Sequence, residues 1–177
     1  MRLCRDEQEL AAVPWRALRN PVVVEYRDVR SADGRYRKWR YVVAGEHGAQ
    51  RHLVISRRWV VKAQRRVAEE SAIGEELAYT RLRDDPNREL LVRGARALGL
   101  DVVAFDYART QAGELVVFEP NPFATLWASF NVDARYDYQR PCVERLYATL
   151  VAFWLERAGL LPDASAELRA LASSAPG

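Results

Sequence analysis

Two short apolar runs around a glycine-containing polar stretch constrain the fold of this chain most strongly. Residues 102–107 (VVAFDY) and 115–119 (LVVFE) are rich in β-branched and aromatic side chains, and Gly113 lies between them. Runs of this composition joined by a short polar turn predict a β-hairpin. Residues 37–45 and 51–56 flank a second glycine-containing turn. We therefore expect two hairpins and an antiparallel sheet.

Three side chains with hard oxygen atoms stand in the first hairpin: Asp106, Glu119 and Asn121. Side chains alternate along a strand, so Glu119 and Asn121 share a face. A two- or four-residue turn brings Asp106 onto that face, whereas a three- or five-residue turn reverses it. Carboxylate and amide oxygens suit Mg²⁺, which is usually held together with substrate phosphates. The spacing predicts a nucleotide–magnesium site, and the alternative is a strand end followed by a turn-rich Glu-Pro-Asn-Pro exit.

The remaining segments carry mainly helical signals. Residues 86–98 predict a helix with Asp85 as its N-cap and Gly99 as its C-terminal stop. Further helices are expected within residues 1–19, at 141–157 and at 165–171. Residues 22–26 (VVVEY) predict a buried strand instead. The fold class expected from these signals is α+β, with an antiparallel sheet packed on helices.

Composition and charge limit the class of protein. The chain has 177 residues, of which 49% are hydrophobic, enough for one domain with a real core. It has two cysteines, Cys4 and Cys142, without metal-ligand spacing, and neither a signal peptide nor a long apolar run is visible. These features favour a cytoplasmic protein with no membrane segment. The net charge of +3 comes mainly from arginine, which suits phosphate-bearing ligands.

The order of these features resembles the C-terminal half of an ATP-grasp domain. A helix ending in ALGLD (residues 97–101) precedes a strand that carries Asp106 near its end, a glycine turn and a strand ending in E-x-N before proline. The resemblance implies that ATP and Mg²⁺ bind here, with Asp106, Glu119 and Asn121 as the magnesium ligands.

The same resemblance assigns two further parts of the site. Val24, Glu25 and Tyr26 resemble the hinge whose backbone reads the adenine edge, and an acidic residue is often found there. Arg40, in the stretch KWRYVVAG, resembles the arginine that contacts the terminal phosphate, and Lys38 is expected to assist it. A solvated edge arginine and a plain core strand are the alternatives for these two segments.

The resemblance covers residues 1–127, and residues 128–177 are expected to form a helical C-terminal extension on the same core. The implied activity is that of an ATP-dependent carboxylate–amine or carboxylate–thiol ligase, which activates an unidentified carboxylate substrate as an acyl phosphate. An ATP-grasp fold clasps ATP between two subdomains, and the first of them, with its glycine-rich loop and lysines, has no counterpart in this sequence. The implied partner is a missing N-terminal half, a separate subunit or a second copy of the chain.

Two other functions remain open. A basic module for nucleic acid or another polyanion is supported by arginine–aromatic interleaving at residues 36–41 and 135–140, although nucleic acid is the less expected partner. A non-catalytic interaction domain would use the apolar helix at 141–157. His47 and His52 are interpreted as structural or exposed, because neither belongs to a recognisable serine or carboxylate arrangement.

Overall fold

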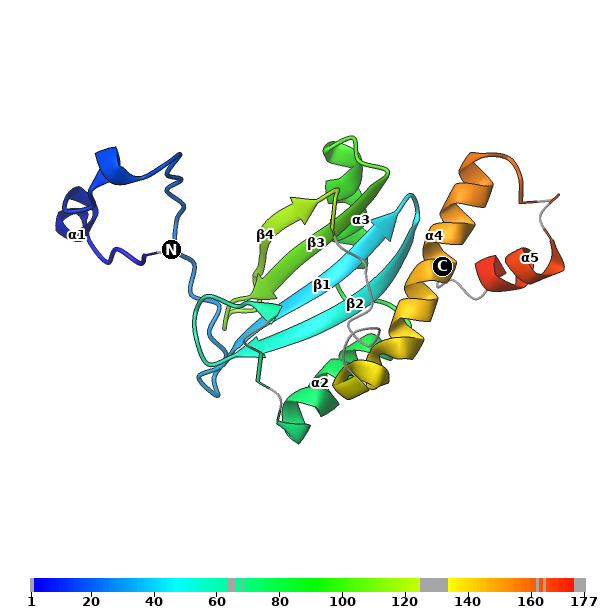
Figure 1. The fold of residues 1–177 in the computed structure, drawn as a ribbon, viewed down its shortest axis with the longest axis horizontal. Coiled ribbons are helices and arrows are strands. Elements are labelled where there is room, and N and C mark those ends of the chain that lie inside the picture. The colour runs from blue at the N-terminus through cyan, green and yellow to red at the C-terminus, as the bar shows by residue number, and fades with distance from the viewer. Residues whose placement is uncertain are drawn as a thin grey trace.

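The computed structural model describes residues 2–63, 66–67, 69–124, 134–161, 163 and 165–173. At its centre is a four-stranded antiparallel sheet in the order β2-β1-β3-β4 (Figure 1). The strands are β1 (Tyr36–Ala44), β2 (His47–Ser56), β3 (Val102–Arg109) and β4 (Leu115–Asn121). Each hairpin pairs its own two strands, and β1 pairs with β3 to join them. Both predicted hairpins and the α+β class are confirmed.

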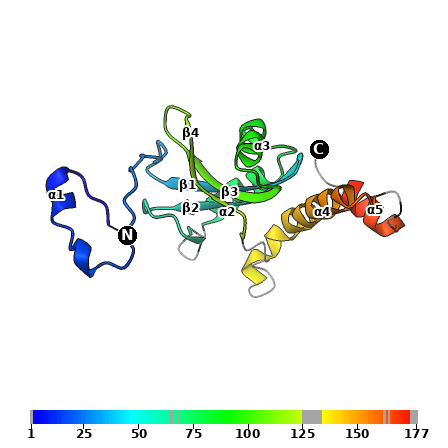
Figure 2. The same cartoon turned by 90° about the horizontal axis from the view of Figure 1, so that it is seen from above.

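Helices cover both faces of this sheet (Figure 2). The α-helices are α1 (Glu7–Ala11), α2 (Glu70–Thr80), α3 (Arg88–Ala97), α4 (Arg140–Arg157) and α5 (Ala166–Ser173), with 3₁₀ turns η1 (Trp15–Ala17) and η4 (Ala134–Gln139). The helices predicted at 86–98, 141–157 and 165–171 correspond to α3, α4 and α5. Within the described residues, no helix combines the length and apolar character required to cross a bilayer.

Alternation along β1 divides the core into two layers. Tyr41 and Val43 lie in a cluster with Leu91 of α3, whereas Val42 lies on the opposite face with Leu146 of α4. Residues of β2 and α2 extend the layer that contains Tyr41. Helices α2 and α3 therefore cover the same face of the sheet, and α4 covers the other. The helix α4 is therefore a core helix on one face, where residues such as Leu146 and Phe153 are buried, whereas Tyr147 and Trp154 are exposed.

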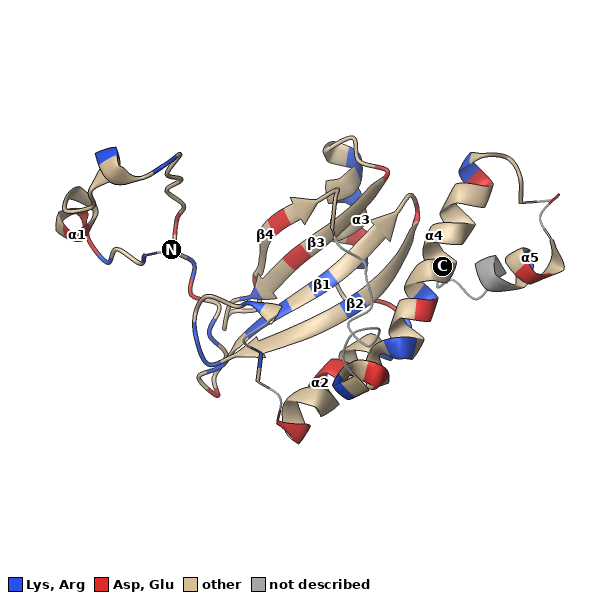
Figure 3. Cartoon of the chain, in the orientation of Figure 1, with Lys and Arg blue, Asp and Glu red and all other residues tan. Residues whose placement is uncertain are grey.

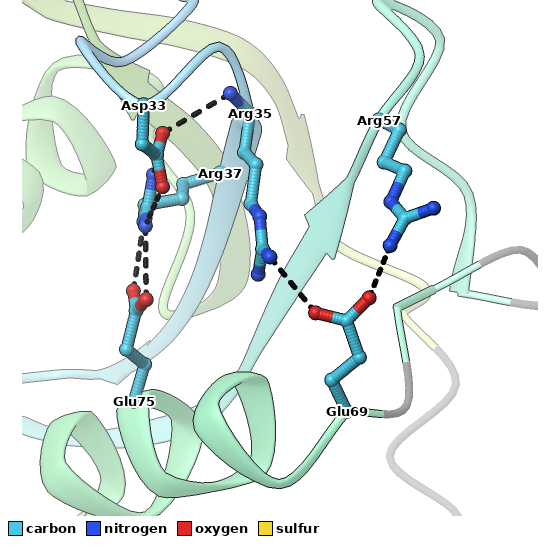
Figure 4. A network of polar contacts seen from close by, with 6 residues as sticks. All are labelled: Asp33, Arg35, Arg37, Arg57, Glu69 and Glu75. Atoms are coloured by element: carbon cyan, nitrogen blue, oxygen red, sulfur yellow. Dashed lines mark hydrogen bonds and ion pairs between the residues drawn. The ribbon is translucent and has the colours of Figure 1, made fainter.

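The start of α2 is tied to the start of β1 by an arginine–carboxylate network (Figure 4). Arg37 binds Glu75 of α2 at 2.8 Å, and Arg35 binds Glu69 at 2.8 Å. Arg57, from the loop after β2, also pairs with Glu69. Residues an odd number apart point to opposite faces of a strand. Lys38 and Arg40 therefore point away from the face on which Arg35 and Arg37 bind α2. The closely spaced cations in this stretch are thus divided between the α2 side and the opposite face.

The predicted strand at residues 22–26 is wrong. This segment belongs to no helix or strand, and it lies with α1 to one side of the sheet (Figures 1 and 2). The side chain of Val22 is 82% exposed and that of Val24 is 74% exposed. β-Propensity measures how well a side chain packs on a sheet surface, so a run of valines becomes a strand only beside a neighbouring strand.

The N-terminus of α3 is held by a buried carboxylate. Asn87, rather than Asp85, occupies the N-cap position. Asp85 lies beneath it and accepts hydrogen bonds from the backbone N–H of Asn87 at 2.7 Å and from the hydroxyls of Tyr79 and Tyr107. These donors belong to α2, β3 and the start of α3. The Asp85 side chain therefore connects one strand of the sheet with the two helices that cover the same face.

We expect Asp85→Ala to lower the free energy of unfolding by about 3 kcal/mol, because it leaves two buried tyrosine hydroxyls without their shared acceptor. Urea denaturation measures this difference. The control is Asp101→Ala, which removes an exposed ion pair with Arg157 and should change stability by about 0.5 kcal/mol or less. Equal effects of the two substitutions would contradict the assigned role of Asp85.

Candidate functional site

One face of the sheet carries four ionisable side chains, one from each strand, which we call the charged row. His52 is the register partner of Arg40, Arg40 of Asp106, and Asp106 of Glu119. Directly opposed residues of antiparallel strands place their side chains on the same face, with Cβ atoms about 5 Å apart. Figure 3 shows a basic position on β1 beside acidic positions on β3 and β4.

A β-bulge in β2 sets one end of the charged row. Tyr41 pairs with Gln50, but Arg40 pairs with His52, so Arg51 is an additional residue on β2. An uninterrupted register would place Arg51, a second cation, opposite Arg40. The bulge instead directs the buried Arg51 side chain toward η4, where it donates a hydrogen bond to Gln139 at 3.4 Å.

A second bulge, in β4, sets the other end. Arg109 pairs with Leu115, so the turn spans the five residues 110–114. A five-residue turn by itself would place Phe118 opposite Asp106. The register shifts between Asp106 and Tyr107, and Glu119 becomes the partner of Asp106. The turn is thus of the five-residue kind, which by itself reverses the face, and the bulge restores the shared face of Asp106 and Glu119.

Asp106 lies at the centre of the charged row and is only 1% exposed. Its Oδ1 accepts a hydrogen bond from Arg40 Nε at 2.5 Å, and its Oδ2 accepts from Lys38 Nζ at 2.5 Å and from Arg40 Nη2 at 2.9 Å. Burial alone raises the pKa of Asp106, but the hydrogen bonds from Arg40 and Lys38 outweigh it and lower the pKa below 3.8. A buried carboxylate is tolerated because two cations compensate it.

The other two predicted metal ligands lie beside Asp106 but have different environments. Glu119 is exposed and makes no hydrogen bond or ion pair with any described residue. Asn121 is the register partner of Ala104, two residues from Asp106, and therefore shares its face. The Asn121 Oδ1 atom accepts a hydrogen bond from the Phe123 backbone at 2.9 Å.

These residues fit one kind of metal site and not another. Among the described residues, no three His, Cys, Asp or Glu side chains group closely enough to hold a metal ion. Two neighbouring carboxylates are nevertheless the usual protein contribution to a Mg²⁺ ion that also binds phosphates. The donor set suits magnesium brought in with a phosphate ligand, provided that this ligand draws Lys38 and Arg40 away from the Asp106 oxygens that they now bind.

Positive charge dominates around the charged row. Burial is the main reason that the pKa of His52 lies well below 6.5, and nearby cations lower this pKa further. In order of influence these cations are Arg51, Arg40, Arg66 and Lys38. The imidazole is therefore neutral at pH 7. No local pattern predicts this position of His52, because the residue enters the row only through the bulge in β2.

The predicted hinge residues lie outside the charged row. Val24 is exposed, Glu25 forms an ion pair with Arg27 at 3.4 Å, and no hydrogen bond or ion pair between described residues connects either of them to Asp106. Tyr26 packs edge-on against Trp59, with ring centres 5.9 Å apart.

Tyr26 also approaches the strand that carries Lys38. Burial and the neighbouring Tyr36 raise the pKa of Tyr26 to about 12. Tyr36 shares with Lys38 the face of the charged row, because the two residues are two apart on β1. The aromatic pair Tyr26 and Trp59 thus stands near the Tyr36 end of β1, on the Lys38 side of the row, and sequence reasoning missed the contribution of Trp59.

A second buried polar cluster supports the edge of the sheet beside the row. Glu76 of α2 accepts hydrogen bonds from Arg66 at 3.1 Å, Tyr138 at 2.6 Å and Gln139 at 2.9 Å. The polar and aromatic residues before α4 are therefore used to fix α4 against α2. A cavity of about 530 Å³ lies nearby between these two helices, and its lining includes no member of the charged row.

No protein-family model and no curated protein sequence matches the chain. Solved structures that resemble part of it include a RiPP-associated ATP-grasp ligase from Chryseobacterium gregarium in complex with ADP and a leader and core peptide. Its sequence identity is 12% and its TM-score is 0.34, over 63% of this chain and 33% of that one. Another is the macrocyclase MdnC from Microcystis aeruginosa MRC bound with precursor peptide MdnA, at 13% identity and a TM-score of 0.33 over the same shares. The chain thus spans about a third of the length of these structures.

The depressed pKa of His52 predicts a loss of stability in mild acid. The unfolded chain takes up a proton on this residue below about pH 6.5, whereas the folded chain does so only at lower pH. The free energy of unfolding should therefore fall as the pH drops below 6.5, by about 1 kcal/mol between pH 7.5 and 5.5 from this residue. Urea denaturation at both pH values should show a smaller fall in His52→Gln. His47→Gln serves as control and should retain the His52 contribution; equal falls in wild type and His52→Gln would refute it.

Proposed function

We propose that this chain is the nucleotide-binding part of an ATP-dependent ligase and that the charged row receives the phosphates of a magnesium–ATP complex. The observation that carries this proposal is the pairing of Asp106 with Glu119 across β3 and β4, directly beside Lys38 and Arg40. It unites on one face the carboxylates that suit magnesium and the cations that suit phosphate. The resemblance of the E-x-N strand end to the ATP-grasp pattern supports the same assignment.

Each residue has a distinct role in the proposed reaction. Lys38 and Arg40 bind the phosphate oxygens, and Arg40 offsets the charge that develops on the transferred γ-phosphoryl group. Asp106, Glu119 and Asn121 hold magnesium, which when bound neutralises phosphate charge. A substrate carboxylate attacks the γ-phosphorus and ADP leaves, forming an acyl phosphate. An amine or thiol then attacks the acyl carbon and releases inorganic phosphate.

The base of the nucleotide is proposed to lie beside the row, beyond Lys38 toward the Tyr36 end of β1. Val24, Glu25 and Tyr26 supply the hinge, with backbone groups available because this segment is in no described strand. Tyr26 and Trp59 provide aromatic surface for the adenine ring. Lys38 lies between Tyr36 and Arg40 on this face. It would therefore contact the phosphates nearer the base, and Arg40 those farther from it.

A complete active site also requires a covering element. The Glu119 end of the charged row is exposed, and phosphoryl transfer to a carboxylate requires exclusion of water. We propose that residues 1–127 form the nucleotide-binding unit, with residues 128–177 as a helical extension. The cover is supplied by an N-terminal half, a separate subunit or a second copy of the chain, in the cytoplasm where ATP is available.

Calorimetric titration of the protein with ATP tests the site directly. We expect binding that is strengthened by Mg²⁺ and that Glu119→Gln weakens by about tenfold, because this variant loses one magnesium ligand. Glu114→Gln, an exposed glutamate in the β3–β4 turn, is the matched control and should bind as the wild type does. Binding that needs no magnesium and falls steeply with salt would instead indicate a polyanion-binding module. Absence of any ATP binding would refute the proposal.

The adenine assignment predicts a difference between two ligands. Tyr26→Ala should weaken ATP binding by about tenfold, since stacking of a base on an aromatic ring contributes about 1–3 kcal/mol, but should leave tripolyphosphate binding unchanged. Parallel calorimetric titrations with both ligands measure this selectivity. An equal loss for both ligands, or no loss for either, would place the base elsewhere.

A further inference from the structure

The charged row already satisfies its own central carboxylate. Both oxygens of Asp106 are bound, one by Arg40 and the other by Lys38 and Arg40 together, and the side chain is 1% exposed. Three N–H donors occupy the two Asp106 oxygens, and this carboxylate is so deeply buried that a metal ion reaches it only when a donor moves away. Lys38 and Arg40 keep further N–H groups, but their side chains are only 19% and 14% exposed, so a phosphate competes with Asp106 for them. The proposed magnesium ligand and the proposed phosphate ligands are therefore bound to each other before either ligand arrives.

The remaining candidates for magnesium are few. Glu119 is unpaired among the described residues, and the Asn121 side-chain oxygen accepts a local backbone hydrogen bond. A single exposed carboxylate binds Mg²⁺ weakly, because this ion gives up its hydration water reluctantly. Magnesium alone should consequently bind this face poorly until Asp106 is released.

Resting on the proposed function, we propose that magnesium and polyphosphate bind by exchange of partners at Asp106. Polyphosphate draws Lys38 and Arg40 away from the carboxylate. Asp106, now without its cations and beside Glu119, then binds the magnesium ion. The buried carboxylate cannot remain uncompensated, because an unpaired charge in the interior is strongly destabilising. Asp106 thus acts both as a magnesium ligand and as an internal competitor of phosphate.

The exchange has two measurable consequences. Magnesium and polyphosphate must strengthen each other's binding by the same factor, since coupling between two ligands is reciprocal. Removal of the Asp106 charge must also strengthen magnesium-free polyphosphate binding, because Lys38 and Arg40 are then released in advance. Removal of a magnesium ligand that binds neither cation would give only the smaller gain expected from a general change of potential.

The test is calorimetric titration of the whole chain with tripolyphosphate in the presence of a chelator. Asp106→Asn should bind tripolyphosphate about tenfold more tightly than the wild type, and added Mg²⁺ should no longer improve its binding. Glu119→Gln removes the same charge from the neighbouring position but releases neither cation. Its magnesium-free affinity should rise by about threefold or less, as expected for a general change of potential.

A second variant tests the exchange from the metal side. Lys38→Met removes one competitor of magnesium, so Mn²⁺ alone, used as a magnetic probe, should bind about threefold or more tightly than it binds the wild type. Lys62→Met, at an exposed position, removes the same charge and should leave Mn²⁺ binding unchanged. This measurement decides the question if Asp106→Asn fails to fold, which circular dichroism shows.

The outcomes separate the exchange from the function on which it rests. Magnesium-dependent ATP binding by the wild type, without tighter tripolyphosphate binding in Asp106→Asn or tighter Mn²⁺ binding in Lys38→Met, would overturn the exchange and leave the proposed function standing. Failure of the wild type and every variant to bind ATP, tripolyphosphate or Mn²⁺ would overturn both. Tighter magnesium-free binding in Asp106→Asn, with little change in Glu119→Gln, would establish the exchange.

Discussion

The burial of the Asp106 carboxylate between Lys38 and Arg40 is the interaction on which the functional face of this protein depends. A charge removed from water must be paired and hydrogen-bonded, and both oxygens of Asp106 meet this requirement. The pairing also fixes the directions of two long cationic side chains that would otherwise be mobile in solvent. The same compensation makes the face a candidate for charged ligands. A magnesium ion can replace the cations beside Asp106, and a polyphosphate can replace the carboxylate beside Lys38 and Arg40.

The sheet places these groups through two local irregularities at one level. One bulge adds Arg51 to β2 and the other adds Phe118 to β4, and they flank the Arg40–Asp106 pair on both sides. Without them, Arg51 and Phe118 would occupy the ends of the row in place of His52 and Glu119. The bulges thus replace a cation and an aromatic ring with a neutral imidazole and a carboxylate. A change of one residue in register determines whether two carboxylates are neighbours at all.

The elements could be predicted where local pattern and tertiary environment agree. The hairpins, α3 and α4 follow from alternation and apolar periodicity, because each buries the face that its sequence marks as apolar. Residues 22–26 were predicted wrongly, since valine-rich sequence specifies a strand only when a partner strand lies alongside. Asp85 was assigned as a cap, but its role is set by Tyr79 and Tyr107, which come from distant parts of the chain. Contacts of this kind have no signature in a local window.

Which oxygen-bearing and cationic side chains stand on which strand follows from the amino-acid sequence, because alternation and spacing are properties of the chain alone. Glu119 and Asn121 share a face for that reason, as do Lys38 and Arg40. Only the tertiary structure decided that Asp106 faces Glu119, that both its oxygens are bound by cations, and that His52 completes the row. Those facts depend on turn length, on bulges and on pairing between segments more than sixty residues apart. Strand register and burial arise only when those segments pack together. They are therefore set by the hydrogen bonding and packing of all four strands.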